Sequence, residues 1–423
     1  MSNAINTRKS FSGATSPLHK LCVSITDCHH STPRWSDGGK VVVRNFNIKN
    51  GKLNLNCPSY TDEKTFQERI LRAKPEAGDL IITREAPMGE VCIIPEGIEC
   101  CLGQRMVLIK PDPKKISGNY LLYAMLSEFV QGQINQSDKT GSIVGNLRIP
   151  LLKELEIPLI DGADEIASVL SALDAKINCN SRINAELEAM AKALFDYWFV
   201  QFDFPDANGK PYKSSGGKMS YNVTLKRRIP KGWTDSSILA VADLLGGGTP
   251  TKKKSEYWGG DIPFFTPTDA DGTIFKFSTA DYITDDGLKG SSTRLFGKHT
   301  VFITARGSVG RLVLAGVDMA MNQSCYALRA KPGGSHVFLF FLAKELICHL
   351  QVKSSGSVFN SIVSNDIELT NLAIPKGEVI KKFAAVVEPM FEKIGNNTKE
   401  NLHLAKLRDW LLSMLMNGQV KVA

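Results

Sequence analysis

The most regular hydrophobic pattern in the chain lies between residues 165 and 200. Apolar residues recur there at alternating spacings of four and three, which places one narrow apolar stripe along a helix, as in the seam of a coiled coil. The stripe consists of Ile166, Leu170, Leu173, Ile177, Asn180, Asn184, Leu187, Ala191, Leu194 and Trp198. The pattern therefore predicts a long helix that needs a partner helix to cover its stripe.

The same pattern occurs a second time, about 217 residues further along the chain. Two copies of one such helix in a single chain should pack on each other, and the two-fold relation favours an antiparallel pair. Arg408 departs from the pattern because it replaces an apolar residue, and we expect it to loosen one end of the pair. The second stripe consists of Phe383, Val387, Met390, Ile394, Asn397, Asn401, Leu404, Arg408, Leu411 and Leu415.

Two asparagines interrupt each stripe at matching positions, Asn180 and Asn184 in the first and Asn397 and Asn401 in the second. Buried asparagines lower stability but fix the register, because a slipped pairing leaves their amides without partners. A helix of roughly 36 residues is about 54 Å long, comparable to one and a half turns of duplex DNA at roughly 34–36 Å per turn. We interpret the pair as a spacer of fixed length, with a purely structural core as the open alternative.

The repeat continues, more weakly, into the segments that precede each helix. Residues 83–91 resemble 304–311, which matches Arg84 with Arg306, and Gln104 matches Gln323. Further matches link 140–142, 146 and 157–158 to 355–357, 360 and 374–375, respectively. Each half of the chain is thus predicted to be a globular domain followed by a long helix.

Short β-rich runs such as 79–83 and 301–304 lie between Gly and Pro residues and predict α+β domains with a curved, largely antiparallel sheet. Residues 202–218 are rich in Gly, Pro, Ser and Lys, which is typical of a linker. We predict a pseudo-two-fold arrangement of a first domain at 1–160, a first spacer helix at 161–201, a linker at 202–228, a second domain at 229–376 and a second spacer helix at 377–418.

Composition and charge narrow the class of protein. The length of 423 residues suits two domains, and 43% hydrophobic with 22% charged residues is the balance of a soluble globular protein. No apolar run of membrane-spanning length occurs and the N-terminus is polar, so we expect a cytoplasmic protein. A net charge of +8 permits a polyanionic partner without proving one.

Nine scattered cysteines without a C-x-x-C pair indicate neither a disulfide framework nor a zinc site. Cys28, His29 and His30 are adjacent, but neighbouring residues rarely converge on one metal ion. We therefore expect reduced, mostly packed thiols and no metal bound by this chain.

The chain resembles the specificity subunits of type I restriction-modification systems across nearly its whole length. The most specific stretches are 194–200, LFDYWFV, and 202–219, FDFP followed by GKPYKSSGGKM, together with 229–233, IPKGW. The starts of the two domains, at 27–48 and 247–264, fit moderately well. The first domain lacks the Ile-Pro-x-x-Trp entry of the second, which leaves its N-terminal boundary less defined.

This resemblance implies two target-recognition domains, separated by the helices, that each read one half of a split, asymmetric DNA sequence. It implies two methyltransferase subunits docked on the helices and two restriction subunits that bind in turn. The partners would use S-adenosylmethionine, ATP and Mg, and this chain would bind no cofactor. It would be a component of a type I restriction endonuclease and adenine-N6 methyltransferase, with no catalytic residue of its own.

In such a protein, phosphate contacts position the domains and side chains in the major groove distinguish the bases. We select polar residues at turn-bounded positions as candidate DNA contacts. For the lysine run and for Arg84 and Arg306, a solvated loop and a glycine-shaped turn are open alternatives. The candidates are Arg44, Asn45, Asn47, Arg84, Arg105, Lys139 and Ser142 in the first domain, and Lys252, Lys253, Lys254, Tyr257, Thr266, Arg306, Gln323, Lys353, Ser355 and Asn360 in the second.

Motifs that would make the chain an enzyme by itself are missing. There is no G-x-x-x-x-G-K-[ST] loop, no G-x-G-x-x-G and no Asn-Pro-Pro-aromatic tetrapeptide. The run 111–115 contains one acid, whereas a metal-dependent nuclease needs at least two. A self-sufficient methyltransferase or nuclease is therefore disfavoured, and the main alternative is a coiled-coil adaptor, which would leave the two matched domains without a role.

Overall fold

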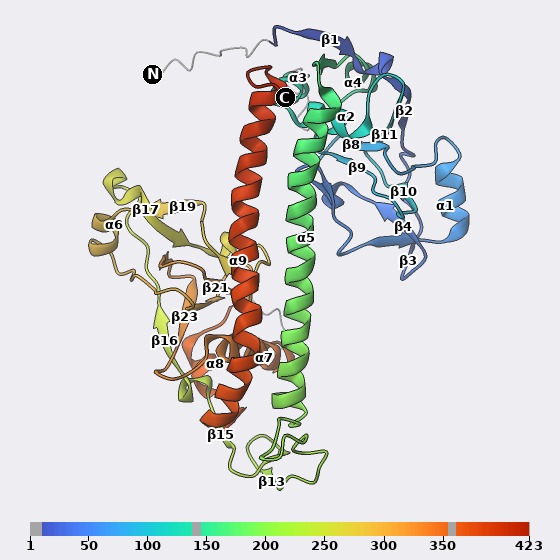
Figure 1. Cartoon of the computed structure of the whole chain (residues 1–423). Helices are drawn as coiled ribbons and strands as arrows, with labels where there is room; N and C mark the ends of the chain where they lie inside the picture. Colours follow the sequence, from blue (N-terminus) through green and yellow to red (C-terminus); the bar gives the residue numbers. More distant parts are fainter. Residues whose placement is uncertain (1–10, 138–144, 354–360, 423) are drawn as a thin grey trace. The chain divides into compact units, whose positions relative to one another are not determined.

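The computed structural model describes residues 11–137, 145–353 and 361–422. The chain forms two compact units, one made of residues 1–177 and 403–423 and the other of residues 178–402. Each unit contains one mixed domain of helices and strands together with part of both long helices (Figure 1). The predicted fold class, two repeated α+β domains with long antiparallel helices, is confirmed.

Two four-stranded sheets form the first domain. The first sheet has the order β2-β11-β8-β9 and is entirely antiparallel. The second has the order β10-β4-β7-β3, in which β10 and β4 are parallel. Their bounds are β2 Cys22–Asp27, β3 Trp35–Ser36, β4 Lys40–Val43, β7 Ser59–Thr61, β8 Leu80–Thr83, β9 Val91–Ile93, β10 Cys100–Leu102 and β11 Met106–Pro111.

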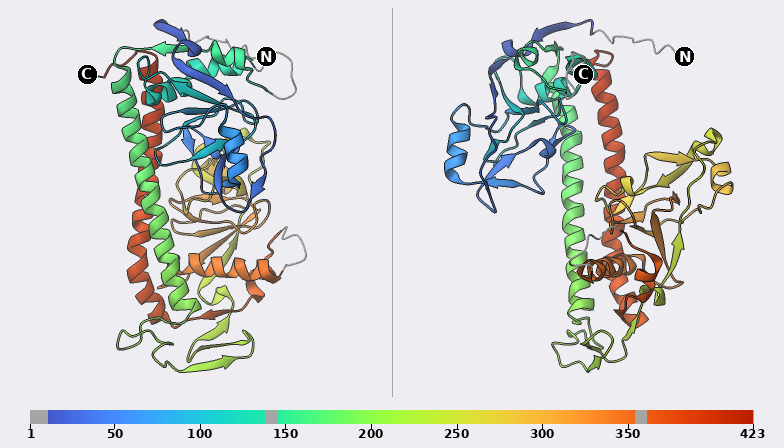
Figure 2. Two further views of the ribbon diagram at one scale, coloured as in Figure 1. Left: turned by 90° about the vertical axis from the view of Figure 1, so that its right-hand side faces the viewer. Right: turned by 180° about the vertical axis from the view of Figure 1, so that it is seen from behind.

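Helices and short pairs of strands complete this domain. The helix α1 (Glu63–Ile70), light blue in Figure 2, packs on β10, and α2 (Gly118–Leu126) packs on β9. Six of the nine residues of α2 are buried, which makes it a core helix. The remaining elements are β1 Ala14–Pro17, which pairs with β12 Glu156–Leu159, the hairpin of β5 Ile48–Lys49 and β6 Lys52–Leu53, the helices α3 Glu128–Ser137 and α4 Ile149–Lys153, and the 3-10 turns Leu18–Lys20 and Asn45–Asn47.

The second domain repeats this plan. The strands β16-β23-β20-β21 follow the same antiparallel order as β2-β11-β8-β9, with β18 added at the edge, and β19-β17-β22 matches β7-β4-β10. The buried helix α7 packs on β20, β21 and β23. The strand bounds are β15 Thr234–Ser236, β16 Ala242–Gly246, β17 Trp258–Phe265, β18 Phe275–Lys276, β19 Asp281–Ile283, β20 Val301–Thr304, β21 Leu312–Ala315, β22 Ala320–Met321, β23 Cys325–Ala330 and β24 Leu372–Ile374. The helices are α6 Asp285–Lys289, α7 His336–Lys353 and α8 Ser364–Leu369, with 3-10 turns at Ile238–Ala240, Ser255–Tyr257 and Pro267–Asp269.

The two long helices are α5 (Ala163–Phe195), which a π-helical turn extends to Val200, and α9 (Gly377–Met416). Within the second unit they run antiparallel, because Asn180 Nδ2 donates to Asn401 Oδ1 at 3.0 Å and Asn397 Nδ2 donates to Asn184 Oδ1 at 2.9 Å. Asn180 and Asn397 are buried. The four asparagines therefore pair crosswise, as a fixed register requires.

Within the first unit the helices meet through α5 residues up to 177 and α9 residues from 403 onwards. Ile166, Leu170 and Leu415 share one buried cluster there. Arg408 does not loosen this end, because its Nη1 donates to Asp174 Oδ1 at 2.7 Å. The carboxylate of Asp174 also accepts a hydrogen bond from Tyr123 Oη at 2.9 Å. A charged residue on the stripe is tolerated because an acid on the opposite helix neutralises it.

The segment 202–228, predicted as a linker, is folded against the second domain. The ring of Phe204 stacks on Tyr212 and Trp233, with centroids 4.7 and 5.4 Å apart. The strand β13 (Met219–Asn222) pairs with β14 (Arg227–Pro230). The Gly, Pro and Ser residues of this segment thus lie in turns, which aromatic packing holds in place.

Candidate nucleic-acid interface

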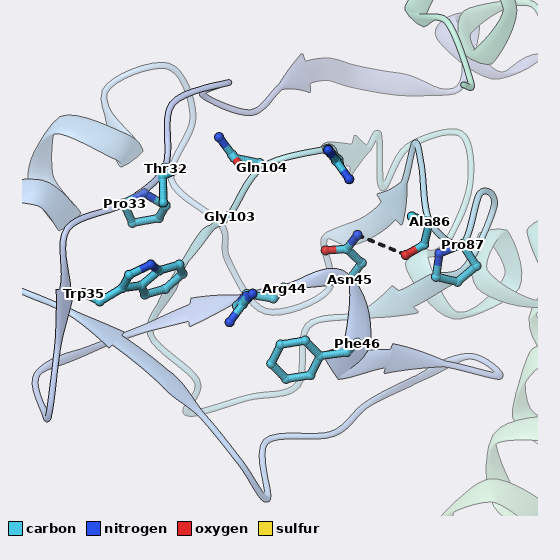
Figure 3. A pocket seen from close by; sticks show the side chains of 11 residues that line it. Thr32, Pro33, Trp35, Arg44, Asn45, Phe46, Ala86, Pro87, Gly103 and Gln104 are labelled. Carbon is cyan, nitrogen blue, oxygen red and sulfur yellow. Dashed lines mark hydrogen bonds between the residues drawn. The ribbon is translucent and has the colours of Figure 1, made fainter. Parts of the chain in front are cut away.

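A cavity of about 510 Å³ opens on the first domain where several strands end (Figure 3). Its walls are the loop after β2, the turn after β4, the turn after β8 and the connection from β10 to β11. The lining residues are Thr32, Pro33, Trp35, Arg44, Asn45, Phe46, Ala86, Pro87, Gly103, Gln104 and Arg105. Three of the predicted DNA contacts, Arg44, Asn45 and Arg105, therefore come together at one site.

The guanidinium of Arg44 lies over two aromatic rings. Its central carbon is 4.9 Å from the ring centroid of Trp35 and 4.8 Å from that of Phe46. Both residues are exposed, at 48% for Trp35 and 56% for Phe46, and Figure 3 shows the side chain of Arg44 between them. Such cation–π contacts hold the guanidinium by its faces and leave the N–H donors on its edge available to a ligand.

The turn Asn45–Asn47 shapes the floor of the cavity. Asn47 is 2% exposed, and its Oδ1 accepts a hydrogen bond from Arg44 N at 2.9 Å while its Nδ2 donates to Asn54 O at 2.9 Å. Asn45 Nδ2 donates to the backbone oxygens of Glu85 and Ala86, both at 3.2 Å. Asn47 is thus a structural residue that cannot reach a duplex, and Asn45 joins two loops of the site.

Arg105 and Gln104 form the opposite wall. Arg105 Nε lies 3.2 Å from Glu85 Oε2, and its backbone has a φ of 65°, which is rare for a residue other than glycine. Gln104 Nε2 donates to His30 O and so ties this wall to the loop after β2. The cavity therefore carries two arginines, one of them already paired with an acid.

Arg84, also predicted as a DNA contact, points into the protein. Its Nη1 donates to Asp27 Oδ1 at 3.1 Å and to Oδ2 at 2.9 Å, and its Nε donates to Leu147 O at 3.1 Å. Only 13% of the side chain is exposed. With its donors engaged inside the domain, Arg84 joins β2 and β8 to the segment before α4.

The backbone shows that Arg84 and Arg306 do not occupy matched places in the repeat. Arg84 N donates to Arg105 O at 2.8 Å, and in the second domain Ala305 N and Arg306 N both donate to the equivalent oxygen, that of Ser324, at 2.9 and 3.2 Å. The acceptors decide the match, because Arg84 O accepts from Leu147 N at 3.0 Å and Ala305 O accepts from Ile362 N at 2.9 Å. Arg84 therefore corresponds to Ala305. Arg306 is one residue further along and is exposed.

The second domain has the same backbone arrangement at the matching loops. We call this arrangement, the turn after a strand together with the loop that bonds the end of that strand, the platform. Thr266 N donates to Asp269 Oδ2 at 2.8 Å, as Arg44 N donates to Asn47. Asn322 N donates to Phe265 O at 3.0 Å, as Gly103 N donates to Val43 O at 2.8 Å. The platform presents Thr266, Pro267 and Thr268 where the first domain presents Arg44, Asn45 and Phe46, whereas Gln104 has the identical counterpart Gln323.

The lysine run of the second domain is held by aromatic rings. Lys254 Nζ donates to Tyr257 Oη at 2.9 Å, and Lys252 Nζ lies 5.9 Å from the ring centroid of Trp258. Lys252, Lys253 and Lys254 are all exposed. The run is therefore an anchored, positively charged loop.

Other predicted contacts lie outside the described residues or at their edge. Lys139, Ser142, Ser355 and Asn360 belong to segments that the structure does not describe. Lys353 is the last residue of α7.

Eight lining residues were not among the predicted contacts, and Trp35, Phe46 and Gln104 have the largest side chains of the eight. Trp35 and Phe46 each lie in a polar, turn-rich segment close to a basic residue. Large aromatic residues in such a segment have no core to enter, and this is the signal in the sequence that indicates a binding surface. Gln104 was visible only as a match to Gln323.

Within the described residues, no group of three or more His, Cys, Asp or Glu residues is arranged to hold a metal ion. The nine cysteines are free thiols, and burial raises the pKa of Cys92 and of Cys100 to about 12. In the same part of the chain, every helix is too short or too polar to cross a membrane.

Comparison with known proteins shows one family. The model of the type I restriction modification DNA specificity domain matches residues 29–189 and 230–405. The specificity subunit of the type I restriction enzyme MjaIX from Methanocaldococcus jannaschii is 27% identical over 369 residues, which cover 85% of this chain and 81% of that protein. The EcoR124I/EcoR124II specificity subunit of Escherichia coli is 38% identical over 294 residues, covering 67% and 64%.

A solved structure has a similar fold. The crystal structure of the S subunit of a type I restriction-modification system from M. genitalium aligns with a TM-score of 0.57 over 98% of both chains, at 15% sequence identity. Each match to the family model covers one globular domain and most of the long helix that follows it.

Proposed function

Because the chain belongs to the family of the type I restriction modification DNA specificity domain, we propose that each of its two domains reads one half of a split DNA sequence. The chain is a specificity subunit of a type I restriction-modification system, a role shared by its relatives in M. jannaschii and E. coli. The finer assignment of one half-site to each domain rests on the two matched platforms.

The observation that carries this proposal is a shared backbone with different side chains. The two platforms have the same turn, closed by Asn47 in one domain and Asp269 in the other. The other residues of the turn differ in kind, because Arg44, Asn45 and Phe46 in the first domain correspond to Thr266, Pro267 and Thr268 in the second. Base contacts depend on the side chain while the backbone sets its position, so this difference suits two half-sites of different sequence.

The positively charged residues around the platform of the second domain suit the phosphate backbone. Lys252, Lys253 and Lys254 are exposed there, as is Arg306. Such contacts release counterions and make binding fall with salt. They orient the domain on the duplex and carry no sequence information.

Exposed apolar residues on the long helices provide docking surfaces for the methyltransferase partners. In the first unit Val169 is 37%, Leu407 43% and Trp410 53% exposed. In the second unit Met190 is 52% and Val386 45% exposed. The repeat relates Val169 to Val386 and Met190 to Leu407, so one surface occurs twice and would accept two copies of a partner.

In the full complex the partners perform the chemistry. Two restriction subunits would join the two methyltransferase subunits, and these partners would use S-adenosylmethionine, ATP and Mg in the cytoplasm. This chain would choose the site and contribute no catalytic group.

The direct test is selection from a random duplex library by the chain in complex with its methyltransferase partner. We expect enrichment of two short conserved blocks with a constant spacing, and an affinity that falls steeply between 50 and 200 mM salt, as neutralisation of several phosphates requires. A coiled-coil adaptor that reads no DNA would enrich no sequence, and this result would refute the proposal.

A further inference from the structure

We propose that Arg44 reads a guanine in the half-site of the first domain and that Trp35 and Phe46 are its positioning residues. This inference rests on the proposed function, because it names the base that one of the two platforms recognises. The second domain, which has Thr266 at the matching place, would have no such preference there.

The geometry around Arg44 restrains its side chain before any ligand binds. The rings of Trp35 and Phe46, with centroids 4.9 and 4.8 Å from its central carbon, cover the guanidinium of Arg44. The backbone N–H of Arg44 is held by a hydrogen bond to the buried Asn47. An exposed arginine normally loses considerable side-chain entropy when it binds a partner. Stacking reduces that loss, so the fork of donors meets its ligand already oriented.

The comparison of the two platforms favours a base contact over a phosphate contact. Phosphates are the same in both half-sites, and a residue that binds them has no reason to change from arginine to threonine between equivalent turns. The residue at another matched position is identical in the two domains. Gln104 Nε2 donates to His30 O in the first domain, and Gln323 Oε1 accepts from Thr249 Oγ1 in the second. The variable position is therefore the one that reads sequence.

The charges near Arg44 also favour a base contact over a phosphate contact. Glu85 is next to the lining residue Ala86 in the chain, and its carboxylate pairs with Arg105 at 3.2 Å and accepts from Asn146 Nδ2 at 2.7 Å. A carboxylate at this place repels a phosphate and offsets the charge of Arg105. A base edge is neutral and meets no such repulsion.

Among the bases, guanine best matches the N–H donors on the guanidinium edge of Arg44. Guanine presents two acceptors, N7 and O6, in the major groove, and arginine is its commonest bidentate partner. Adenine is read by an asparagine or glutamine amide, but the amide nitrogens of Asn45 and Gln104 are engaged by backbone oxygens within the domain. The edge of Arg44 thus remains to select the base.

The test compares variants of the chain, each purified with its methyltransferase partner, in selection from a random duplex library. Arg44→Ala should abolish the preference for one guanine in one block, with a loss of about 10- to 100-fold in discrimination at that position. The other positions of the same block should be unchanged, which also shows that the first domain of the variant is folded, and the block read by the second domain should be unchanged as well. Trp35→Ala should weaken the same preference without moving any other position.

Arg44→Lys separates the two kinds of contact, since it keeps the charge and loses the planar fork. We expect it to reduce guanine selection at an unchanged dependence of affinity on salt. Lys114→Ala, which removes an exposed charge elsewhere in the same domain, is the matched control and should leave the selected sequence intact.

Two other results would overturn the inference. A uniform loss of affinity in Arg44→Ala, with the logarithmic salt slope reduced by about 0.9 and the selected sequence unchanged, would make Arg44 a phosphate contact. Selection of the same guanine by Arg44→Ala at unchanged affinity would show that Arg44 does not touch DNA. If the unaltered chain selects no sequence, the proposed function itself fails, and the two failures are thereby distinguished.

Discussion

At the scale of single residues, the structure gives different surroundings to two arginines that look alike in the sequence. Arg44 follows strand β4 and Arg84 follows strand β8, and both precede a turn. The first stacks on exposed rings above a cavity, while the second is held by Asp27 inside the domain. The sequence predicts the residue type and the turn, but the partner of Arg84 is 57 positions away, and only the folded domain reveals it.

Arg84→Ala should therefore act on stability. It removes an ion pair in which Arg84 Nη1 bonds both oxygens of Asp27, which is 25% exposed, and the loss of a partly buried pair of this kind costs about 2–4 kcal/mol. Chemical denaturation, followed by a probe in the first domain, measures the change, with Arg44→Ala as the matched control that should cost less than about 1 kcal/mol. Unchanged stability together with lost DNA binding would make Arg84 a direct contact after all.

The stacked histidines of the second domain predict a dependence of stability on pH. The rings of His299 and His336 are 4.0 Å apart and nearly parallel. Burial, together with the neighbouring His299 and Lys298, lowers the pKa of His336 to about 4. Glu388 Oε1 lies 3.8 Å from His336 Nδ1 and would favour the charged form, but it is also held by Ser335, and burial dominates.

Because the pKa of His336 is lower in the folded state than in the unfolded chain, the unfolded state takes up the proton first. The contribution of neutral His336 to the free energy of unfolding is complete above the ordinary pKa of about 6.5 and is lost as the pH falls from there towards 4. Urea denaturation should show a loss of about 2 kcal/mol between pH 8 and pH 5 from this residue. His336→Phe keeps an aromatic ring and should remove that part of the dependence, and an equal dependence in this variant would contradict the assignment.

At the scale of elements, the long helices were predictable because a heptad pattern depends only on local spacing. The register was predictable too, since four matched asparagines satisfy one another in one alignment only, and the structure pairs Asn180 with Asn401 and Asn184 with Asn397. The effect of Arg408 was not predictable. Its acid, Asp174, lies on the other helix, where the sequence shows only a polar residue beside the stripe.

Asn184 and Asn397 should show strong coupling in a double-mutant cycle. Asn397→Leu leaves the amide of Asn184 without one of its partners inside the helix pair and should cost about 1–3 kcal/mol. Replacing both residues by leucine removes the unsatisfied group and should recover most of this loss, at the expense of a defined register. Additive losses in the equilibrium unfolding of the single and double variants would show that the two amides do not depend on each other.

At the scale of the whole molecule, the repeat predicted two domains of one fold, and it did so because the long period is visible in the helices. A single period could not align the loops. The Thr-Pro pairs at 32–33 and 249–250 are 217 residues apart in the sequence, but the equivalent turns at Arg44 and Thr266 are 222 residues apart, because insertions accumulate in loops. Arg84 was consequently matched to Arg306 when its true counterpart is Ala305.

The segment 202–228 shows a second limit at this scale. Its composition indicates turns, and turns are what it contains, but composition says nothing about the packing of Phe204 between Tyr212 and Trp233. Whether a turn-rich segment is a loose tether or part of a domain depends on such long-range contacts of its few aromatic residues.

The most direct test of the central claim is to express the chain with its methyltransferase partner in a host without other DNA modification, and to locate N6-methyladenine across the genome. Two domains that each read one half of the target predict a single split motif, two short defined blocks separated by a gap of constant length. Methylation at one uninterrupted motif, or methylation by this chain in the absence of its partner, would contradict the account.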